Sequence, residues 1–185
     1  TAADGLRLVA SGEVLRRIAG RALIQAHKDL IERKFLAVNQ FAFSQDGCLV
    51  AYNLLRDHQA CHPDHVLLST DKSTAFQRKS RARMQRWLMA ELPDLVPYYH
   101  MLYGDSATLH FDGRTLLSEH GCQQGCAHGS LLFCAGEVSI MADLIRQFPT
   151  VLFVCIADDV YMLGPAEDAS RAFAAWQAAT EAAGE

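Results

Sequence analysis

Two kinds of hydrophobic pattern alternate along this chain, and they predict different elements. Three short runs rich in Val, Leu, Ile, Phe and Tyr are typical of β-strands, at residues 66–71, 151–156 and 160–163. Elsewhere apolar residues recur with helical spacing, which predicts helices at about 11–34, 46–56, 77–92, 129–147 and 166–182. Asp112-Gly113 predicts a tight turn between strands 108–111 and 114–117. Strands interleaved with helices favour an α+β fold with a sheet covered on one face.

Some of the expected helices carry further signals. Ser11 can cap the first helix, whose apolar stripe consists of Leu15, Ile18, Ala19, Ala22 and Leu23. Pro93 ends the helix at 77–92. The helix at 129–147 is apolar on several sides, so we expect it to be the buried central helix.

Composition and charge limit the class of protein. With 185 residues, of which 50% are hydrophobic, the chain can bury one core of ordinary domain size. Its formal net charge of −4 argues mildly against nucleic-acid binding. Two local basic clusters qualify this, and each is either a nucleic-acid contact or a solvated helix face. Met84, Trp87 and Leu88 have the spacing of a buried stripe, which leaves most of the neighbouring basic residues for the outer face. The clusters are Arg78, Lys79, Arg81, Arg83 and Arg86, and Arg16, Arg17 and Arg21.

The pair Asp158-Asp159 joins two of the expected strands. Two adjacent carboxylates repel each other and resist burial, so a cation or water is needed to tolerate them there. Successive side chains of a strand face opposite ways, so we expect one of the two to dominate as a metal ligand. The alternative is an ordinary solvated turn. Asp71 ends a separate apolar run, and carboxylates from two strand ends suit magnesium, which prefers oxygen ligands.

A glycine-rich loop, Gly121 to Phe133, lies between these acids and can bring backbone and Gln donors close to a ligand. The order of all these features resembles the reverse transcriptase domain of retrotransposon-type polymerases. The first palm motif of that family is similar to Asp71 through Phe76, the second to Gly121 through Phe133, and the third to Ile156 through Asp159. Two segments of its fingers resemble Arg7-Leu-Val-Ala-Ser11 and Gln40-Phe41-Ala42-Phe43.

This resemblance implies a polymerase palm, a small antiparallel sheet backed by the helices at 77 and 129, with partial helical fingers. It implies one partial domain, with fingers in residues 1–60, a palm in residues 61–185 and the thumb absent. The implied activity is RNA-directed DNA polymerisation: two-metal nucleotidyl transfer from deoxynucleoside triphosphates to a DNA primer 3′-hydroxyl on an RNA template. The two ions are Mg²⁺, with Mn²⁺ as a substitute.

Individual roles follow from the same resemblance. Asp71 and Asp158 would bridge the two ions, and Asp159 would assist as a partial or outer ligand. Gln124 and Gly125 would line the incoming nucleotide. Phe76 would lie under its sugar and exclude a 2′-hydroxyl, and Arg7 would contact the triphosphate. For Phe76 and Gln124 the alternative roles are core packing and loop hydrogen bonding.

Three departures from the family pattern keep other functions open. Ile156 stands where the family usually has Tyr, Cys126-Ala127 where it has Asp-Pro, and Leu8 where it has Pro. A degenerate remnant that at most binds nucleic acid is therefore one alternative. An RNA-templated RNA polymerase is another, although the aromatic ring of Phe76 argues against it.

The remaining expectations concern context. The chain begins with Thr1 and ends soon after an Ala-rich helix, so we expect a segment of a longer polyprotein. With no signal peptide and no long apolar span, its six cysteines are expected to be reduced in a soluble intracellular protein, nuclear or cytoplasmic. Structural zinc is a further alternative at two groups of His and Cys residues, His58 to His65 and His120 to His128.

Overall fold

The computed structural model describes residues 9–10, 12–70 and 75–184. The chain divides into two compact units. The first comprises Thr1–Ala26 and Thr74–Gly136, and the second comprises His27–Ser73 and Glu137–Glu185. The boundary between fingers and palm at residue 60 stays a prediction.

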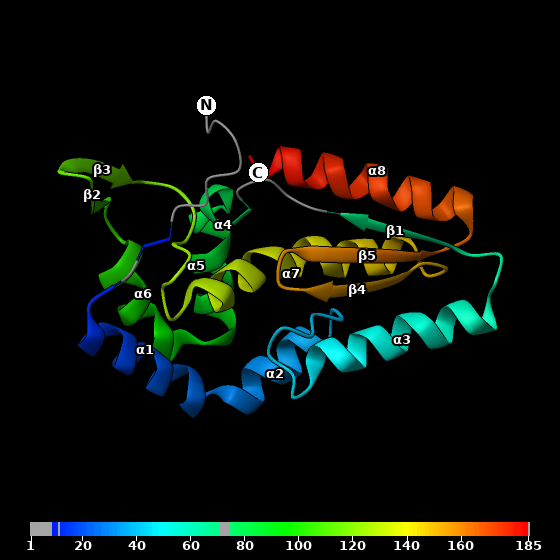
Figure 1. Ribbon diagram of the computed structural model, residues 1–185, viewed down its shortest axis with the longest axis horizontal. Helices are drawn as coiled ribbons and strands as arrows, with labels where there is room; N and C mark the ends of the chain where they lie inside the picture. The colour runs from blue at the N-terminus through cyan, green and yellow to red at the C-terminus, as the bar shows by residue number, and fades with distance from the viewer. Residues whose placement is uncertain (1–8, 11, 71–74, 185) are drawn as a thin grey trace. The chain divides into compact units, whose positions relative to one another are not determined.

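The second unit is built on a three-stranded antiparallel sheet (Figure 1). Its strands are β1 (Val66–Thr70), β4 (Leu152–Ile156) and β5 (Asp159–Gly164), in the order β1-β5-β4. Thr70 is opposite Val160, and Ile156 is opposite Asp159. The three apolar runs of the sequence therefore form one sheet, with the acidic pair at the tip of the β4–β5 hairpin.

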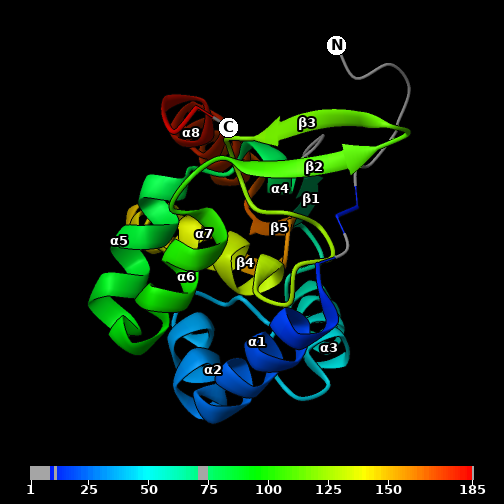
Figure 2. The same ribbon diagram turned by 90° about the vertical axis from the view of Figure 1, so that its left-hand side faces the viewer.

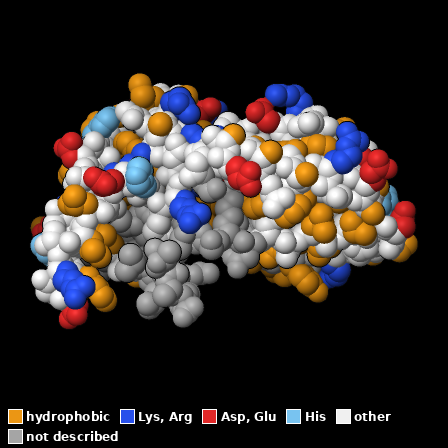
Figure 3. All heavy atoms as spheres, turned by 90° about the horizontal axis from the view of Figure 1, so that it is seen from above, with side chains coloured by type: hydrophobic (Ala, Val, Ile, Leu, Met, Phe, Trp, Pro, Cys, Tyr) orange, Lys and Arg blue, Asp and Glu red, His pale blue; other side chains and the backbone are white. Residues whose placement is uncertain are grey.

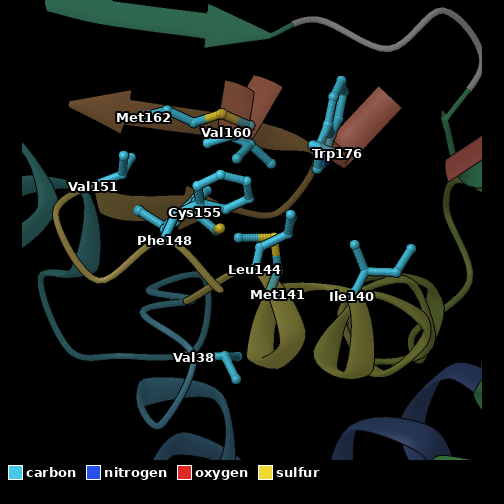
Figure 4. Packing of buried hydrophobic residues seen from close by; sticks show 12 residues of the cluster. Val38, Ile140, Met141, Leu144, Phe148, Val151, Cys155, Val160, Met162 and Trp176 are labelled. Atoms are coloured by element: carbon cyan, nitrogen blue, oxygen red, sulfur yellow. The ribbon is translucent and has the colours of Figure 1, made fainter. Parts of the chain in front are cut away.

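One face of this sheet carries the main core of the unit (Figure 4). Val160 and Met162 of β5 and Cys155 of β4 point to this side, as alternation along a strand requires. They pack with residues of α7 (Gly129–Gln147), including Met141 and Leu144, and with Trp176 of α8 (Ala166–Ala182). Both helices have the bounds that the sequence predicts.

The opposite face is partly covered by α3 (Gly47–Cys61), so the expectation of a sheet covered on one face was wrong. Ala51 of α3 packs with Val154 of β4. A groove of about 550 Å³ remains between α3 and the sheet, lined by side chains that include Tyr52, Leu67 and Leu163. The helix α2 (Lys28–Leu36) completes the unit.

The first unit is mainly helical and carries a separate two-stranded hairpin (Figure 2). Asp112-Gly113 connects its strands as predicted, with positive φ at both residues. The elements are α1 (Val14–Ala26), α4 (Ala75–Arg78), α5 (Arg81–Glu91), a 3₁₀ turn (Pro93–Leu95), α6 (Val96–Tyr103), β2 (Ala107–Phe111), β3 (Arg114–Ser118) and the first turns of α7.

Several helix predictions were too long or missed an element. The helix expected at 11–34 is broken at His27, whose φ of −110° and ψ of 12° are not helical. The helix expected at 77–92 is interrupted at Ser80, which is extended. The helix α6 was missed, because Pro97 falls at its first turn, where proline is tolerated. Along α1, Leu15 and Ile18 are exposed and do not form a buried stripe.

In the described parts of the chain, every helix is too short or too polar to cross a membrane.

Candidate active site

The two acids of the hairpin tip occupy different structural positions. Asp158 lies in the two-residue turn and is half-buried, whereas Asp159 is the first residue of β5 and is exposed. Asp159 is paired with Ile156, so its backbone belongs to the sheet. The turn and the first residue of β5 therefore present the two carboxylates at the tip of an apolar hairpin.

The turn contains a residue in an unfavourable backbone conformation. Ala157 has a φ of +52°. In this region the Cβ of an L-residue crowds the backbone, at a cost of about 1–2 kcal/mol. Such strain persists where neighbouring groups hold it, and it is concentrated at functional sites.

The group that holds this turn is the side chain of Gln40. The backbone N–H of Ala157 donates to Gln40 Oε1 at 2.8 Å, and Gln40 Nε2 donates to the carbonyl of Ala157 at 3.0 Å. The N–H of Ala42 also donates to Gln40 Oε1, at 3.1 Å. Gln40 is 3% exposed, so these bonds are sheltered from water.

Gln40 is placed by its own backbone against the outer edge of β4. Cys155 N–H donates to the carbonyl of Asn39, and Phe41 N–H donates to the carbonyl of Cys155, each at 2.8 Å. Residues 39–41 thus add a short parallel bridge to the sheet. The sequence assigned Gln40 to a fingers segment and missed this contact, because the partners are 117 residues apart.

Asp71 lies outside the described residues, so its shared role with Asp158 in holding the ions stays a prediction. The strand that leads to it is described up to Thr70, which pairs with Val160 beside the acidic hairpin. The Thr70 hydroxyl also donates to the Val160 carbonyl at 3.3 Å. The strand β1 thus runs antiparallel beside the acidic hairpin.

The glycine-rich loop belongs to the first unit and packs tightly there. A Cβ on Gly121, whose φ is +63°, would come within 2.3 Å of the Phe76 and Gln77 backbones. A Cβ on Gly125, with φ +96°, would lie 2.7 Å from the carbonyl of Ala10. Both positions therefore require glycine, for close approach and for φ.

Phe76 and Gln124, two residues of this unit predicted to contact the nucleotide, differ in how they are held. The ring of Phe76 is buried and stacks on Phe133, with centroids 4.7 Å apart. The side-chain Oε1 of Gln124 is buried and has no hydrogen-bond partner among the described residues. Its backbone carbonyl accepts from the N–H of Ala10 at 2.8 Å. Arg7 lies outside the described residues.

The basic cluster at 78–86 is largely engaged within the protein, which corrects its expected placement on an outer face. Lys79 is 1% exposed, with Nζ 4.6 Å from the centre of the Phe133 ring. Arg81 donates to the carbonyls of Ser118 and Gly121 at 2.8 and 2.9 Å. Arg83 donates to the carbonyl of Gly136 at 3.0 Å. Arg81 thus bonds to the segment before the glycine-rich loop and to the loop itself, whereas Lys79 and Arg83 contact the first turns of α7.

The groups of His and Cys residues form no metal cage in the part of the chain that is described. There, no three His, Cys, Asp or Glu side chains are arranged to hold an ion. His58 and His65 instead share a hydrogen bond of 3.0 Å between their rings. Burial and the neighbouring His62 and His65 lower the pKa of His58.

Comparison with known proteins gives a fold relationship. No protein-family model and no curated protein sequence matches the chain. Several solved structures are similar to it, and two of them are telomerases. Apo telomerase from Candida tropicalis, truncated from the C-terminal domain, has a TM-score of 0.58 at 7% identity, covering 83% of this chain and 36% of that one. Telomerase from Candida albicans, in complex with a fragment of telomeric RNA, has a TM-score of 0.53 at 12% identity, covering 88% and 32%.

The chain thus spans about a third of the telomerases it matches. At these identities the likeness shows the fold alone, and that fold is reverse-transcriptase-like.

Proposed function

We propose that this chain is part of an RNA-directed DNA polymerase. The observation that carries the proposal is the hairpin tip with Asp158 and Asp159, beside the strand that leads to Asp71, in a reverse-transcriptase-like fold. Acidic residues on neighbouring strands are the arrangement that metal-dependent nucleotidyl transfer needs. A retrotransposon-type source is part of the proposal and rests on the sequence motifs.

The donor set at the tip fits magnesium. Asp158 and Asp159 supply carboxylate oxygens, and the half-buried and exposed positions leave room for the waters that Mg²⁺ keeps. Asp71, Asp158 and Asp159 would hold two ions. When bound, such ions lower the pKa of a primer 3′-hydroxyl and neutralise charge on the triphosphate. Mn²⁺ is a chemically suitable substitute.

The first unit would contribute nucleotide contacts. The unpaired Oε1 of Gln124 is a hydrogen-bond acceptor without a protein partner in the described chain, which suits a ligand contact. The backbone around Gly125 approaches closely without a side chain in the way. The Phe76 ring is fixed by its stack on Phe133, and a rigid ring suits exclusion of a 2′-hydroxyl. Arg7 would contact the triphosphate.

RNA template and DNA primer are the proposed partners. One of the similar telomerases was solved with RNA. Figure 3 shows Lys and Arg interspersed with Asp and Glu over the face in view, without a continuous basic patch there. A longer protein, with a thumb, would supply further contacts to the nucleic acid.

A degenerate remnant is the second candidate. The replacement of an aromatic residue by Ile156 at the third motif favours it, as does the engagement of Lys79, Arg81 and Arg83 inside the protein. A remnant would keep the fold and lose catalysis.

Primer extension tests the proposal. The protein would be a longer form that contains this chain, with an RNA template, a DNA primer and Mg²⁺. Wild type should extend the primer, and Asp158→Asn should lose at least about 100-fold of the rate, because a metal ligand loses its charge. Asp143→Asn is the matched control, since Asp143 is exposed on α7. Absence of extension by wild type, or equal extension by Asp158→Asn, would contradict the proposal.

A further inference from the structure

The backbone of the hairpin tip has two unusual properties at one residue. Ala157 adopts a φ of +52°, and both its N–H and its carbonyl are bonded to the same side chain. A two-residue turn joined to only two strands has few contacts of its own. The conformation of the tip is therefore set from outside the hairpin.

The side chain of Gln40 has the donor and the acceptor that are needed to hold the backbone of Ala157. A carboxamide is the side chain that offers one acceptor and one donor on a planar group, and it can engage the N–H and the carbonyl of one residue together. Glu would lack the donor when ionised, and Met would lack both. Because Gln40 is buried, each bond is worth more than at a surface, and a lost partner leaves a buried polar group unsatisfied.

The two bonds from the Gln40 side chain to Ala157 form a clamp, and the backbone of Gln40 holds this clamp in a fixed position. Asn39 and Phe41 bond to Cys155 on either side of Gln40, and Cys155 lies two residues before Ala157. The side chain therefore cannot shift along β4 without breaking two backbone hydrogen bonds. Ala42 N–H shares the same Oε1, which fixes the carboxamide further.

We propose that Gln40 is a positioning residue for Asp158 and Asp159. By holding Ala157 in its strained conformation, it sets the direction in which the next two residues leave the turn, and so the orientation of the two carboxylates. The orientation of the tip follows from the contacts above, whereas its use in metal binding rests on the proposed function. Gln40 would touch neither substrate nor metal.

The direct test is amide hydrogen exchange of this chain, followed by NMR. Gln40→Met keeps the length of the side chain and removes both bonds, so protection of the Ala157 amide should fall about tenfold, as expected for loss of a bond worth about 1.4 kcal/mol. Gln147→Met is the matched control. It makes the same change at an exposed position of α7, and it should leave the Ala157 amide within about twofold of wild type.

A measurement on the wild type guards against a variant that does not fold. The Nε2 protons of Gln40 should exchange with solvent far more slowly than those of Gln147, which is exposed at the end of α7. Equal exchange of the two side-chain amides would overturn the proposal. So would unchanged protection of Ala157 in Gln40→Met.

Titration with Mn²⁺ links the clamp to the acids. In the wild type, Mn²⁺ should broaden the amide signals of residues 157–160, and Gln40→Met should need about tenfold more Mn²⁺, the usual effect of losing a group that orients a ligand. Equal titrations, with Ala157 protection lost, would overturn the role of Gln40 in orienting the acids. If Mn²⁺ broadens nothing in the wild type, the proposed metal site fails instead. The clamp is then judged by exchange and by the Asp158 and Asp159 amide shifts, which Gln40→Met must move.

Discussion

At the scale of single residues, the φ angles distinguish turns formed by residues that tolerate positive φ from one turn that other residues hold in place. Four non-glycine residues in the described chain have positive φ: Asn39, Asp46, Asp112 and Ala157. Asn and Asp tolerate this region because their short polar side chains bond locally. Ala has no such compensation, and it lies at the tip that carries the acids.

Replacing Ala157 with glycine should therefore stabilise the protein. Removal of the crowded Cβ outweighs the added freedom of the unfolded chain, and we expect a gain of roughly 0.5–1 kcal/mol in the free energy of unfolding. The measurement is urea unfolding. Ala174→Gly, at an exposed helical position of α8, should lose about 1 kcal/mol. Loss of stability in Ala157→Gly would show that no strain is held there.

His128 is the residue with a clear consequence for pH. It is 3% exposed, and its ring lies edge-on to the ring of Tyr98, with the two ring centroids 4.6 Å apart. Its Nε2 has no hydrogen-bond partner in the described chain. Burial lowers its pKa to about 4, and the nearby carbonyl of Gly20 opposes this only partly. The folded protein therefore holds the imidazole neutral at pH values where the unfolded chain binds a proton.

Stability should fall as the pH drops from about 6.5 to about 4. Between these pH values the imidazole binds a proton in the unfolded state but stays neutral in the folded state. The free energy of unfolding of the wild type should therefore fall by on the order of 2–3 kcal/mol because of this group. Urea unfolding at several pH values measures the slope. His128→Asn should flatten it, and His110→Asn, on the exposed side of β2, should not. Identical slopes in all three proteins would contradict the assignment.

At the scale of elements, the glycine-rich loop is held by close backbone contact. Gly121→Ala combines a positive φ with a Cβ placed 2.3 Å from the Phe76 and Gln77 backbones, so it should cost more than about 3 kcal/mol. Gly113→Ala has a similar φ, +68°, with nothing within 4 Å of the added Cβ. It should cost about 1 kcal/mol. Similar losses in the two variants, measured by urea unfolding, would show that the loop is not packed as described.

Local patterns predicted the elements whose signals lie within a few residues. The helix at 129–147, the Asp112-Gly113 hairpin and the apolar strands of the sheet have such signals, and all are confirmed. The break at Ser80 has no Gly or Pro to mark it. It lies beside Lys79, which is buried against Phe133 through a contact that no local pattern contains.

The acidic tip of the hairpin likewise combines residues that a local pattern identifies with contacts that it cannot identify. Its composition identified Asp158 and Asp159, because two adjacent acids in an apolar run are conspicuous. The bonds of Gln40 to Ala157 depend on pairing over 117 residues and could not be found by periodicity. Roles for Asp71, Phe76, Gln124, Gly125 and Arg7 stay predictions.

At the scale of the whole molecule, the two units differ in what they would contribute. The second unit carries the acids on a sheet with packed faces, and the first carries the tightly packed glycine-rich loop. The chain matches about a third of each telomerase, so the proposed polymerisation is best tested in a longer form, whereas the proposed metal binding should be measurable on this chain alone.

Metal-induced thermal stabilisation is the most direct measurement of that central claim. An ion that binds the folded state raises the melting temperature, so Mn²⁺ or Mg²⁺ should raise the Tm of the wild type and of the control Asp143→Asn. Asp158→Asn should melt at the same or a slightly higher temperature without metal, since one charge leaves an acidic pair, and should lose most of the metal-induced shift. Equal metal-induced shifts in wild type and Asp158→Asn, or no shift in the wild type, would contradict a metal site at the hairpin tip.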